Sequence, residues 1–184
     1  MLRSFAGAGR TALLMLLLAA GVPPLRAASS PAAPASAAPT LCAAPELVLF
    51  SCATASGKVI SLCGSPDLGE LRGSLQYRFG TVGAKPELSY PATPQRPKTA
   101  FLSGTIPYSG GGAAYLTFEI SDVRYTVFTG IGKGWEKEGV VVERGAQRLA
   151  YLACRGAWSS EIGPELFERL RIPTDPGESE FEIP

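Results

Sequence analysis

The chain after residue 40 consists of short segments in which apolar and polar residues alternate, divided by Gly, Pro and Ser. Residues 75–79 and 115–120 show the pattern most clearly. Because successive side chains of a β-strand point to opposite faces, each segment predicts a strand with one face in a core and the other in solvent. Several such strands with turn residues between them favour an antiparallel β-sandwich or a small barrel of about 7–8 strands.

The alternation assigns individual side chains to the two faces of the expected sheet. Residues 123–128 repeat it after a tight turn at Ser121-Asp122. The large apolar residues of the three segments are expected in the core: Leu75, Tyr77, Phe79, Leu116, Phe118, Ile120, Val123, Tyr125 and Val127. The polar residues between them are expected in solvent: Gln76, Arg78, Thr117, Glu119, Arg124 and Thr126.

Weaker strand signals and one helix complete the expected fold. Pro164 suits the first position of a helix and Pro173 cannot continue one, so a single short C-terminal helix is expected between them. A Pro-rich loop is expected at residues 91–97. The fold class is therefore mainly β, with further strands expected at residues 47–52, 58–63, 87–90, 99–108, 140–142 and 149–152.

The first residues of the chain indicate export from a bacterial-type cytoplasm. Arg3 and Arg10 precede an apolar run at residues 12–20, and small residues follow from Ala27, as in a cleavable signal peptide. We expect residues 1–27 to be that signal, because the run is too short to span a bilayer. The mature chain is then periplasmic or secreted and keeps no transmembrane segment.

Composition divides the remainder into three parts. Residues 28–40 are rich in Ala, Pro and Ser and hold no large apolar side chain, so they predict a linker. Residues 41–173 have the length of one ordinary domain with a core of its own. Residues 174–184 form an acidic tail that we expect to be frayed.

Four cysteines lie in the expected domain: Cys42, Cys52, Cys63 and Cys154. An even number of cysteines in an exported chain predicts a disulfide framework. A zinc site would need all four as ligands, and their spacing contains no Cys-x-x-Cys pair. Three pairings are open. We favour Cys52 with Cys154, which would tie the first strand to the last, and Cys42 with Cys63.

Charge and composition argue against several classes of function. The whole chain carries a net charge of +1, and three arginines but no acid leave with the signal, so the mature form carries −2 and a nucleic-acid partner is not expected. The chain has no His, which removes the commonest general base and metal ligand.

Two carboxylate pairs were the remaining candidates for catalysis. They are Glu136 with Glu138 and Glu165 with Glu168, and we expect both pairs to be solvated surface charge. Two carboxylates suffice for a glycosidase only when they face each other across a substrate. Neither an enzyme nor a bound cofactor or metal ion is therefore expected.

Two glycine-containing segments are the candidate partner-binding loops. The first, residues 108–115, contains Ser109, Gly110 and three consecutive glycines between two tyrosines, the second of which is Tyr115. Such a loop permits close approach to its backbone, and an ordinary flexible hairpin is the alternative. The second, residues 133–138, places Trp135 between Lys133 and Lys137. Tryptophan in a loop is a common binding anchor, although it can also cover the end of a sheet.

These segments resemble parts of the bacterial envelope lysozyme inhibitors, the membrane-bound and periplasmic families of small disulfide-linked β domains. Phe50-Ser51-Cys52 followed by Gly57-Lys58-Val59 resembles their first hairpin, whose Cys pairs with a C-terminal one, here Cys154. Residues 109–115 resemble the Ser-Gly-x-x-Tyr loop that enters the lysozyme cleft, with two extra residues before the Tyr. Residues 135–137 resemble a neighbouring Trp-and-Lys loop, with a Glu inserted.

The sequence thus predicts an exported, non-catalytic protein-binding module, with a lysozyme as the partner that the resemblance implies. The expected contact residues are Ser109, Gly110, Tyr115, Lys133, Trp135 and Lys137. The alternative is a structural or peptidoglycan-associated envelope protein, and the sequence identifies neither its partner nor its oligomeric state.

Overall fold

The computed structural model describes residues 37–177 and 181–184. The expected signal peptide at residues 1–27 and most of the linker lie outside the described residues. Within the described part, no helix is long and apolar enough to cross a membrane. The last residues of the expected linker already contact the domain: the Ser51 hydroxyl donates to the Pro39 carbonyl at 2.6 Å, and the hydroxyl oxygens of Thr40 and Ser61 lie 3.4 Å apart.

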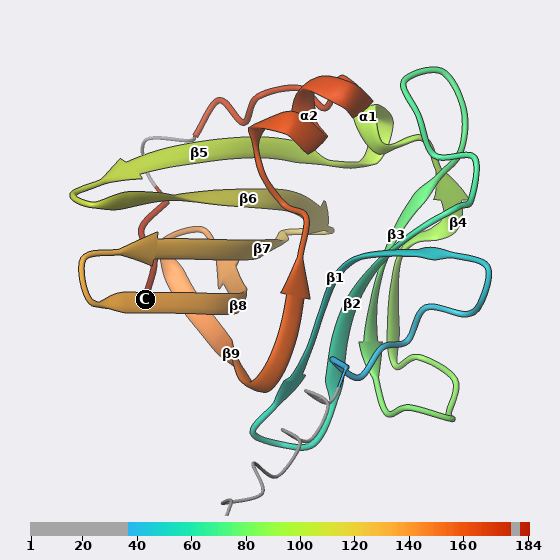
Figure 1. Cartoon of the computed structure of the whole chain (residues 1–184), viewed down its shortest axis with the longest axis horizontal. Coiled ribbons are helices and arrows are strands. Elements are labelled where there is room, and N and C mark those ends of the chain that lie inside the picture. The colour runs from blue at the N-terminus through green and yellow to red at the C-terminus, as the bar shows by residue number, and fades with distance from the viewer. Residues whose placement is uncertain (1–36, 178–180) are drawn as a thin grey trace, which may run out of the picture. The chain divides into compact units, whose positions relative to one another are not determined.

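The described part contains one antiparallel sheet of nine strands in the order β4-β3-β2-β1-β9-β8-β7-β6-β5 (Figure 1). The strands are β1 (Leu47–Thr54), β2 (Val59–Gly64), β3 (Leu75–Gly80), β4 (Leu88–Gln95), β5 (Leu102–Tyr108), β6 (Gly111–Ile120), β7 (Val123–Gly132), β8 (Trp135–Arg144) and β9 (Gln147–Ser160). The mainly β class is confirmed, but the closed barrel or two-sheet sandwich of about 7–8 strands is only approximate.

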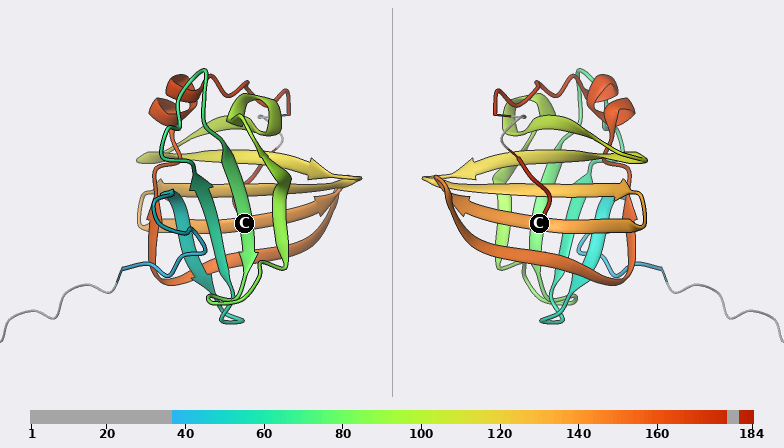
Figure 2. Two further views of the ribbon diagram at one scale, coloured as in Figure 1. Left: turned by 90° about the vertical axis from the view of Figure 1, so that its right-hand side faces the viewer. Right: turned by 90° about the vertical axis from the view of Figure 1, so that its left-hand side faces the viewer.

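The sheet curls into a half-barrel because its longest strand, β9, pairs with two groups of strands. We call these groups, β1–β4 and β5–β8, the two arms of the sheet. The first part of β9 pairs with β8, and its last part, from Cys154 to Ser160, pairs with β1. Register shifts within these pairings accompany the change of partner. Figure 2 shows that the arm β1–β4 faces the arm β5–β8, and β4 and β5 are the edge strands of the sheet. The half-barrel is therefore open along these edges.

Two short helices lie at one end of the half-barrel. The first is α1 (Pro97–Ala100), and the second, α2 (Pro164–Leu170), begins at the proline expected to start it. Arg171 ends α2 in a left-handed conformation, and the chain leaves through Pro173. Three residues of α2 are buried against the inner face of the sheet: Leu166, Phe167 and Leu170.

The inner face holds the main core, in which an aromatic group lies at the centre. Phe118 is stacked on Tyr90 with ring centroids 4.2 Å apart and on Tyr125 at 5.1 Å. Of the residues expected in the core, five are buried: Leu75, Tyr77, Leu116, Phe118 and Val127. Four are half-buried near the rims: Phe79, Ile120, Val123 and Tyr125.

The outer face of the β1–β3 arm is also covered, which corrects the expectation for two polar residues. Gln76 is buried, and its amide donates to the Pro91 carbonyl at 2.8 Å. Arg78 is half-buried and donates to both carboxylate oxygens of Glu46, each at 2.7 Å, and to the Leu41 carbonyl. The segment before β1 provides this cover.

The outer face of the other arm is covered by the end of the chain, which corrects three further expectations. Thr117 and Thr126 are buried there with their hydroxyls 3.2 Å apart. Phe181 and Ile183 pack against a second apolar cluster, formed by Tyr115, Phe128 and Val141. Among its described residues, the tail is therefore docked rather than frayed.

The Pro-rich segment expected as a loop is mostly a strand. Residues 91–95 belong to β4, which lies at the edge of the sheet. Proline lacks the N–H that a central strand would need and is tolerated where one side of the strand has no neighbour. Only residue 96 separates β4 from α1.

All four cysteines form disulfides, in the favoured pairing. Cys52 is bonded to Cys154 and Cys42 to Cys63. The first bond joins β1 to β9 where β9 passes from one arm to the other, and the second fastens the segment before β1 to β2. No cysteine is left to bind zinc. The bonds are compatible with an oxidising compartment.

Candidate functional site

The two candidate loops lie side by side as hairpin turns at the same end of the β5–β8 arm. The turn Ser109-Gly110 joins β5 to β6, and the turn Lys133-Gly134 joins β7 to β8. Lys133 N donates to the Ser109 carbonyl at 3.2 Å, so the turns touch. Both are shorter than expected, because residues 111–115 belong to β6 and residues 135–138 to β8. We call the four turn residues Ser109, Gly110, Lys133 and Gly134 the hairpin tips.

Trp135 lies flat on the outer face beside the tips. A Cβ at Gly132 would collide with its indole ring, so glycine at that position lets the ring lie directly on β7. Tyr108 contacts the indole edge-on with ring centroids 5.4 Å apart. Lys137 places its ammonium 5.9 Å from the indole centroid and donates to the Pro184 carbonyl. Trp135 is half-buried and forms the edge of the surface behind the tips.

Tyr115 is not at this surface, which corrects its place among the expected contact residues. Its side chain is fully buried in the outer cluster, and its hydroxyl donates to Asp175 Oδ2 at 3.0 Å. It lies on β6 four residues beyond the first residue of that strand. The residues that the structure brings together are Ser109, Gly110, Lys133, Trp135 and Lys137.

The opposite, inner face of the same strand ends borders a cavity in two adjoining parts, of about 670 and 470 Å³. The larger part, about 670 Å³, lies between the ends of β5–β8 and the segment that leads from β9 to α2. Its walls are mostly apolar, and two of its large side chains, Ile131 and Trp158, are 55% and 36% exposed. Its other lining residues include Thr105, Gly112, Ala114, Thr129, Glu136, Ile162 and Pro164.

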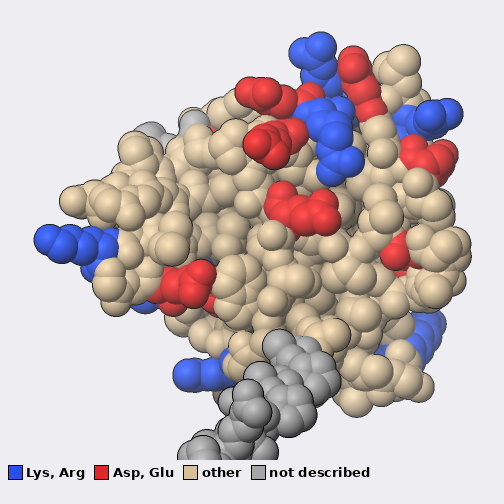
Figure 3. All heavy atoms as spheres, viewed as in Figure 1, with Lys and Arg blue, Asp and Glu red and all other residues tan. Residues whose placement is uncertain are grey.

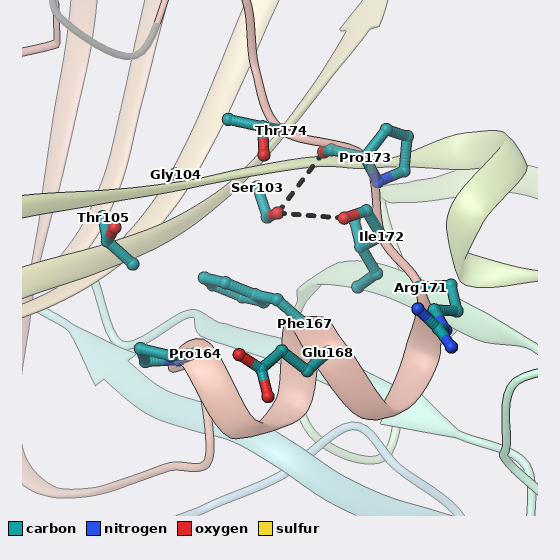
Figure 4. A pocket seen from close by; sticks show the side chains of 10 residues that line it. All are labelled: Ser103, Gly104, Thr105, Pro164, Phe167, Glu168, Arg171, Ile172, Pro173 and Thr174. Carbon is teal, nitrogen blue, oxygen red and sulfur yellow. Dashed lines mark hydrogen bonds between the residues drawn. The ribbon is translucent and has the colours of Figure 1, made fainter.

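The smaller part, about 470 Å³, lies between β5 and α2 and is more polar (Figure 4). The Ser103 hydroxyl lies 3.3 Å from the Ile172 and Pro173 carbonyls. Figure 4 shows the Phe167 ring beneath β5 and the Glu168 carboxylate at the open side. Thr105 and Pro164 line both parts, so the two parts adjoin each other beside β5. We call the two parts together the half-barrel mouth.

Glu138, expected to be solvated, is buried beside the larger part of this mouth. It is 7% exposed, and its Oε1 is a buried oxygen without a hydrogen-bond partner. Burial, and secondarily the charge of Glu136, raises the pKa of Glu138 to about 7. Its register partner Thr129 and its same-face neighbour Glu136 both line the cavity. Sequence reasoning missed this residue, although its alternation with Val140 and Val142 was a usable signal.

The second carboxylate pair, Glu165 and Glu168, is exposed on α2 as expected. On the face seen in Figure 3, basic and acidic side chains are interspersed with broad uncharged areas. Among the residues that the structure describes, no group of three or more His, Cys, Asp or Glu side chains is placed to hold a metal ion.

Comparisons with known proteins add no further constraint. No protein-family model matches the sequence, and no curated protein or solved structure matches it significantly.

Proposed function

We propose that the chain is an exported, non-catalytic module that binds a protein partner through the hairpin tips, and that a lysozyme is the first partner to test. The observation that carries the proposal is the contact between the two turns, since Lys133 N donates to the Ser109 carbonyl. The turns next to the two segments that resemble the inhibitor loops therefore lie together at one end of the sheet. Two turns joined in this way present one surface to a partner.

The chemistry of the tips supports a cleft with acidic groups. Ser109, Gly110, Lys133 and Gly134 are all exposed, and their glycines leave backbone amides open to a partner. Lys133 adds a positive charge to this surface. Lysozymes hydrolyse glycosidic bonds with two carboxylic acids in their cleft, so a lysine entering that cleft would be electrostatically favourable.

The proposal is tested by measuring inhibition of c-, g- and i-type lysozymes by the oxidised chain without residues 1–27. The test variants are Ser109→Arg, which enlarges one tip, and Lys133→Glu, which reverses the charge of the other. Lys85→Glu is the matched control, because Lys85 is an exposed lysine between β3 and β4 on the other arm. We expect inhibition by the parent chain and the control, and at least a tenfold loss in both test variants.

Two outcomes would overturn the lysozyme proposal. The first is an absence of binding to all three lysozyme types by the folded, oxidised chain. The second is binding that Ser109→Arg and Lys133→Glu leave unchanged, which would place the contact elsewhere. A pull-down on purified peptidoglycan, run in parallel, distinguishes an envelope-binding protein, which would be retained there and would leave lysozyme activity intact.

A further inference from the structure

The half-barrel mouth is a second candidate binding site, separate from the hairpin tips. It lies on the inner face of β5–β8, whereas Trp135 and the docked tail lie on the outer face. We propose that the mouth binds a small amphiphile with an apolar chain and an amine head group, with the chain against Trp158, Ile131 and Ala114 and the amine at Glu136.

The size and position of the mouth follow from the open sheet. Because β5 pairs with β6 on one side and makes only the bridge from Ser103 to Thr174 on the other, no strand closes the space between it and the segment before α2. Small residues at Gly112, Ala114 and Gly163 leave that space unfilled. A volume of about 670 Å³ lies within the range of small-molecule sites, which are commonly found in the mouths of β-barrels.

The walls of the mouth favour an apolar chain. Trp158 lies near the end of β9 and Ile131 near the end of β7, and both side chains line the larger part of the mouth. Both side chains keep a third or more of their surface exposed, although neighbouring core residues are fully buried. Covering them with an apolar chain would remove apolar surface from water, which favours binding.

The polar groups of the mouth favour an amine over an acid. The larger part has one charged residue in its wall, the acid Glu136, together with the hydroxyl side chains of Thr105 and Thr129, and its lining includes neither Lys nor Arg. A carboxylate head group would meet another carboxylate there, whereas an ammonium would be paired. The mouth is thus complementary to a cationic amphiphile in both shape and charge.

The burial of Glu138 is an independent observation that also favours a cationic head group. Glu138 is the register partner of Thr129 and a same-face neighbour of Glu136, which both line the cavity, and its buried Oε1 has no hydrogen-bond partner. Leaving a buried polar group without a partner is unfavourable. A positive charge at Glu136 would offset the repulsion between the two carboxylates, since the charge of Glu136 raises the pKa of Glu138. The pair therefore forms an acceptor site that a cationic head group would stabilise.

The test uses Trp158 as its reporter. The sequence has two tryptophans, so Trp135→Phe leaves Trp158 as the single fluorophore without altering the mouth. Decylamine, decanol and decanoate, each below its critical micelle concentration, are titrated into the oxidised single-tryptophan chain. We expect a saturable blue shift with decylamine and at least tenfold weaker binding of decanoate.

Two substitutions in the single-tryptophan chain locate the site. Glu136→Gln removes the proposed amine partner and should weaken decylamine binding at least fivefold while leaving decanol binding unchanged. Thr129→Phe fills the cavity from its wall and should abolish the binding of both, and a thermal melt establishes that this variant is folded. A second filling variant, Ile131→Phe, serves if it is not. Equal affinities for decylamine and decanoate, or unchanged binding in a folded filling variant, would overturn the proposal.

Discussion

The Tyr115 hydroxyl donates to Asp175 Oδ2 at 3.0 Å, and this contact joins the middle of β6 to the start of the C-terminal tail. Both side chains are buried on the outer face of the sheet. The same carboxylate oxygen accepts from Arg124 at 2.8 Å, and Asp175 N donates to the Ser103 carbonyl. Asp175 therefore holds the tail against three strands, β5, β6 and β7, which allows Phe181 and Ile183 to cover the apolar cluster beyond it.

We expect Tyr115→Phe to lower the free energy of unfolding by about 1 kcal/mol and Asp175→Ala by about 3 kcal/mol. The first removes one hydrogen bond, whereas the second also leaves Arg124 without its buried partner. Urea denaturation measures both. The control is Asp122→Ala, which removes an exposed ion pair with Arg144 and should cost less than about 0.5 kcal/mol. Equal losses in Asp175→Ala and the control would contradict this role.

The docking of the tail itself is tested at Phe181. Its ring lies 4.8 Å from that of Tyr115 and 5.9 Å from that of Phe128. Because the side chain is half-buried, Phe181→Ala should lower the free energy of unfolding by about 2 kcal/mol. Glu182→Ala is the matched control, since that neighbour is exposed. If the tail were frayed in solution, both variants would unfold at the same urea concentration as the parent.

The strands and the neighbouring turns could be predicted, because they depend on local pattern. The alternation at residues 75–79 and 115–120 lies within strands β3 and β6. The contact between Ser109 and Lys133 follows from the meander, since successive hairpins place alternate turns at the same end of a sheet. The alternation could not predict which segments cover the outer face of the sheet. It assumes solvent there, and the covering segments before β1 and after Asp175 have no periodicity of their own.

The errors at Gln76, Thr117 and Glu138 have this common origin. Each is a polar residue on a strand, and each is buried because a distant segment or a bend in the sheet lies over it. Tyr115 failed differently, since the glycines before it suggested a loop where β6 had already begun. The half-barrel mouth could not be predicted either, because it depends on β9 leaving β8 and on β5 being an edge strand.

The buried Glu138 predicts that stability falls as the pH rises. Its pKa is about 7 in the folded chain, against an ordinary value of 4.5, so the folded state holds a proton that the unfolded state releases between these pH values. The contribution of this group is most favourable below pH 4.5 and is lost as the pH rises through 7. Glu138→Gln should therefore be more stable than the parent at pH 8, as measured by urea denaturation, and should lose that advantage at pH 4.5.

A Glu138→Gln chain whose stability relative to the parent is the same at pH 4.5 and pH 8 would contradict this linkage. Glu143→Gln on the same strand is a suitable control. Its carboxylate forms only a long ion pair with Arg148, at 3.6 Å. This variant shows whether the loss of any carboxylate from β8 produces the same change.

The ion pair between Glu46 and Arg78 predicts the opposite effect of pH on stability. The hydrogen bonds from Arg78 lower the pKa of Glu46, so the folded state favours its ionised form. The resulting stability is present above pH 4.5 and is lost as the pH falls through the folded-state pKa. Glu46→Gln should cost about 2 kcal/mol at pH 7, and the difference from the parent should shrink in acid. A constant difference between pH 7 and pH 2.5 would exclude the ion pair as its cause.

The two disulfides should contribute unequally. Cys52–Cys154 closes a loop of 102 residues and Cys42–Cys63 one of 21, which corresponds to about 4.7 and 3.3 kcal/mol in the chain-entropy model. The double variant Cys52→Ala/Cys154→Ala should therefore unfold at the lower urea concentration.

The two variants should also differ in where they loosen the fold. Cys42→Ala/Cys63→Ala frees the segment that covers the outer face of β1–β3, so backbone amides near Gln76 and Arg78 should exchange faster with solvent while the β5–β8 arm stays protected. Cys52→Ala/Cys154→Ala releases the junction through which β9 connects the arms, and protection should fall on both sides of it. Hydrogen exchange followed residue by residue distinguishes these patterns. A uniform loss of protection in the Cys42→Ala/Cys63→Ala chain would show that the covering segment is part of the cooperative core rather than a separately fastened layer.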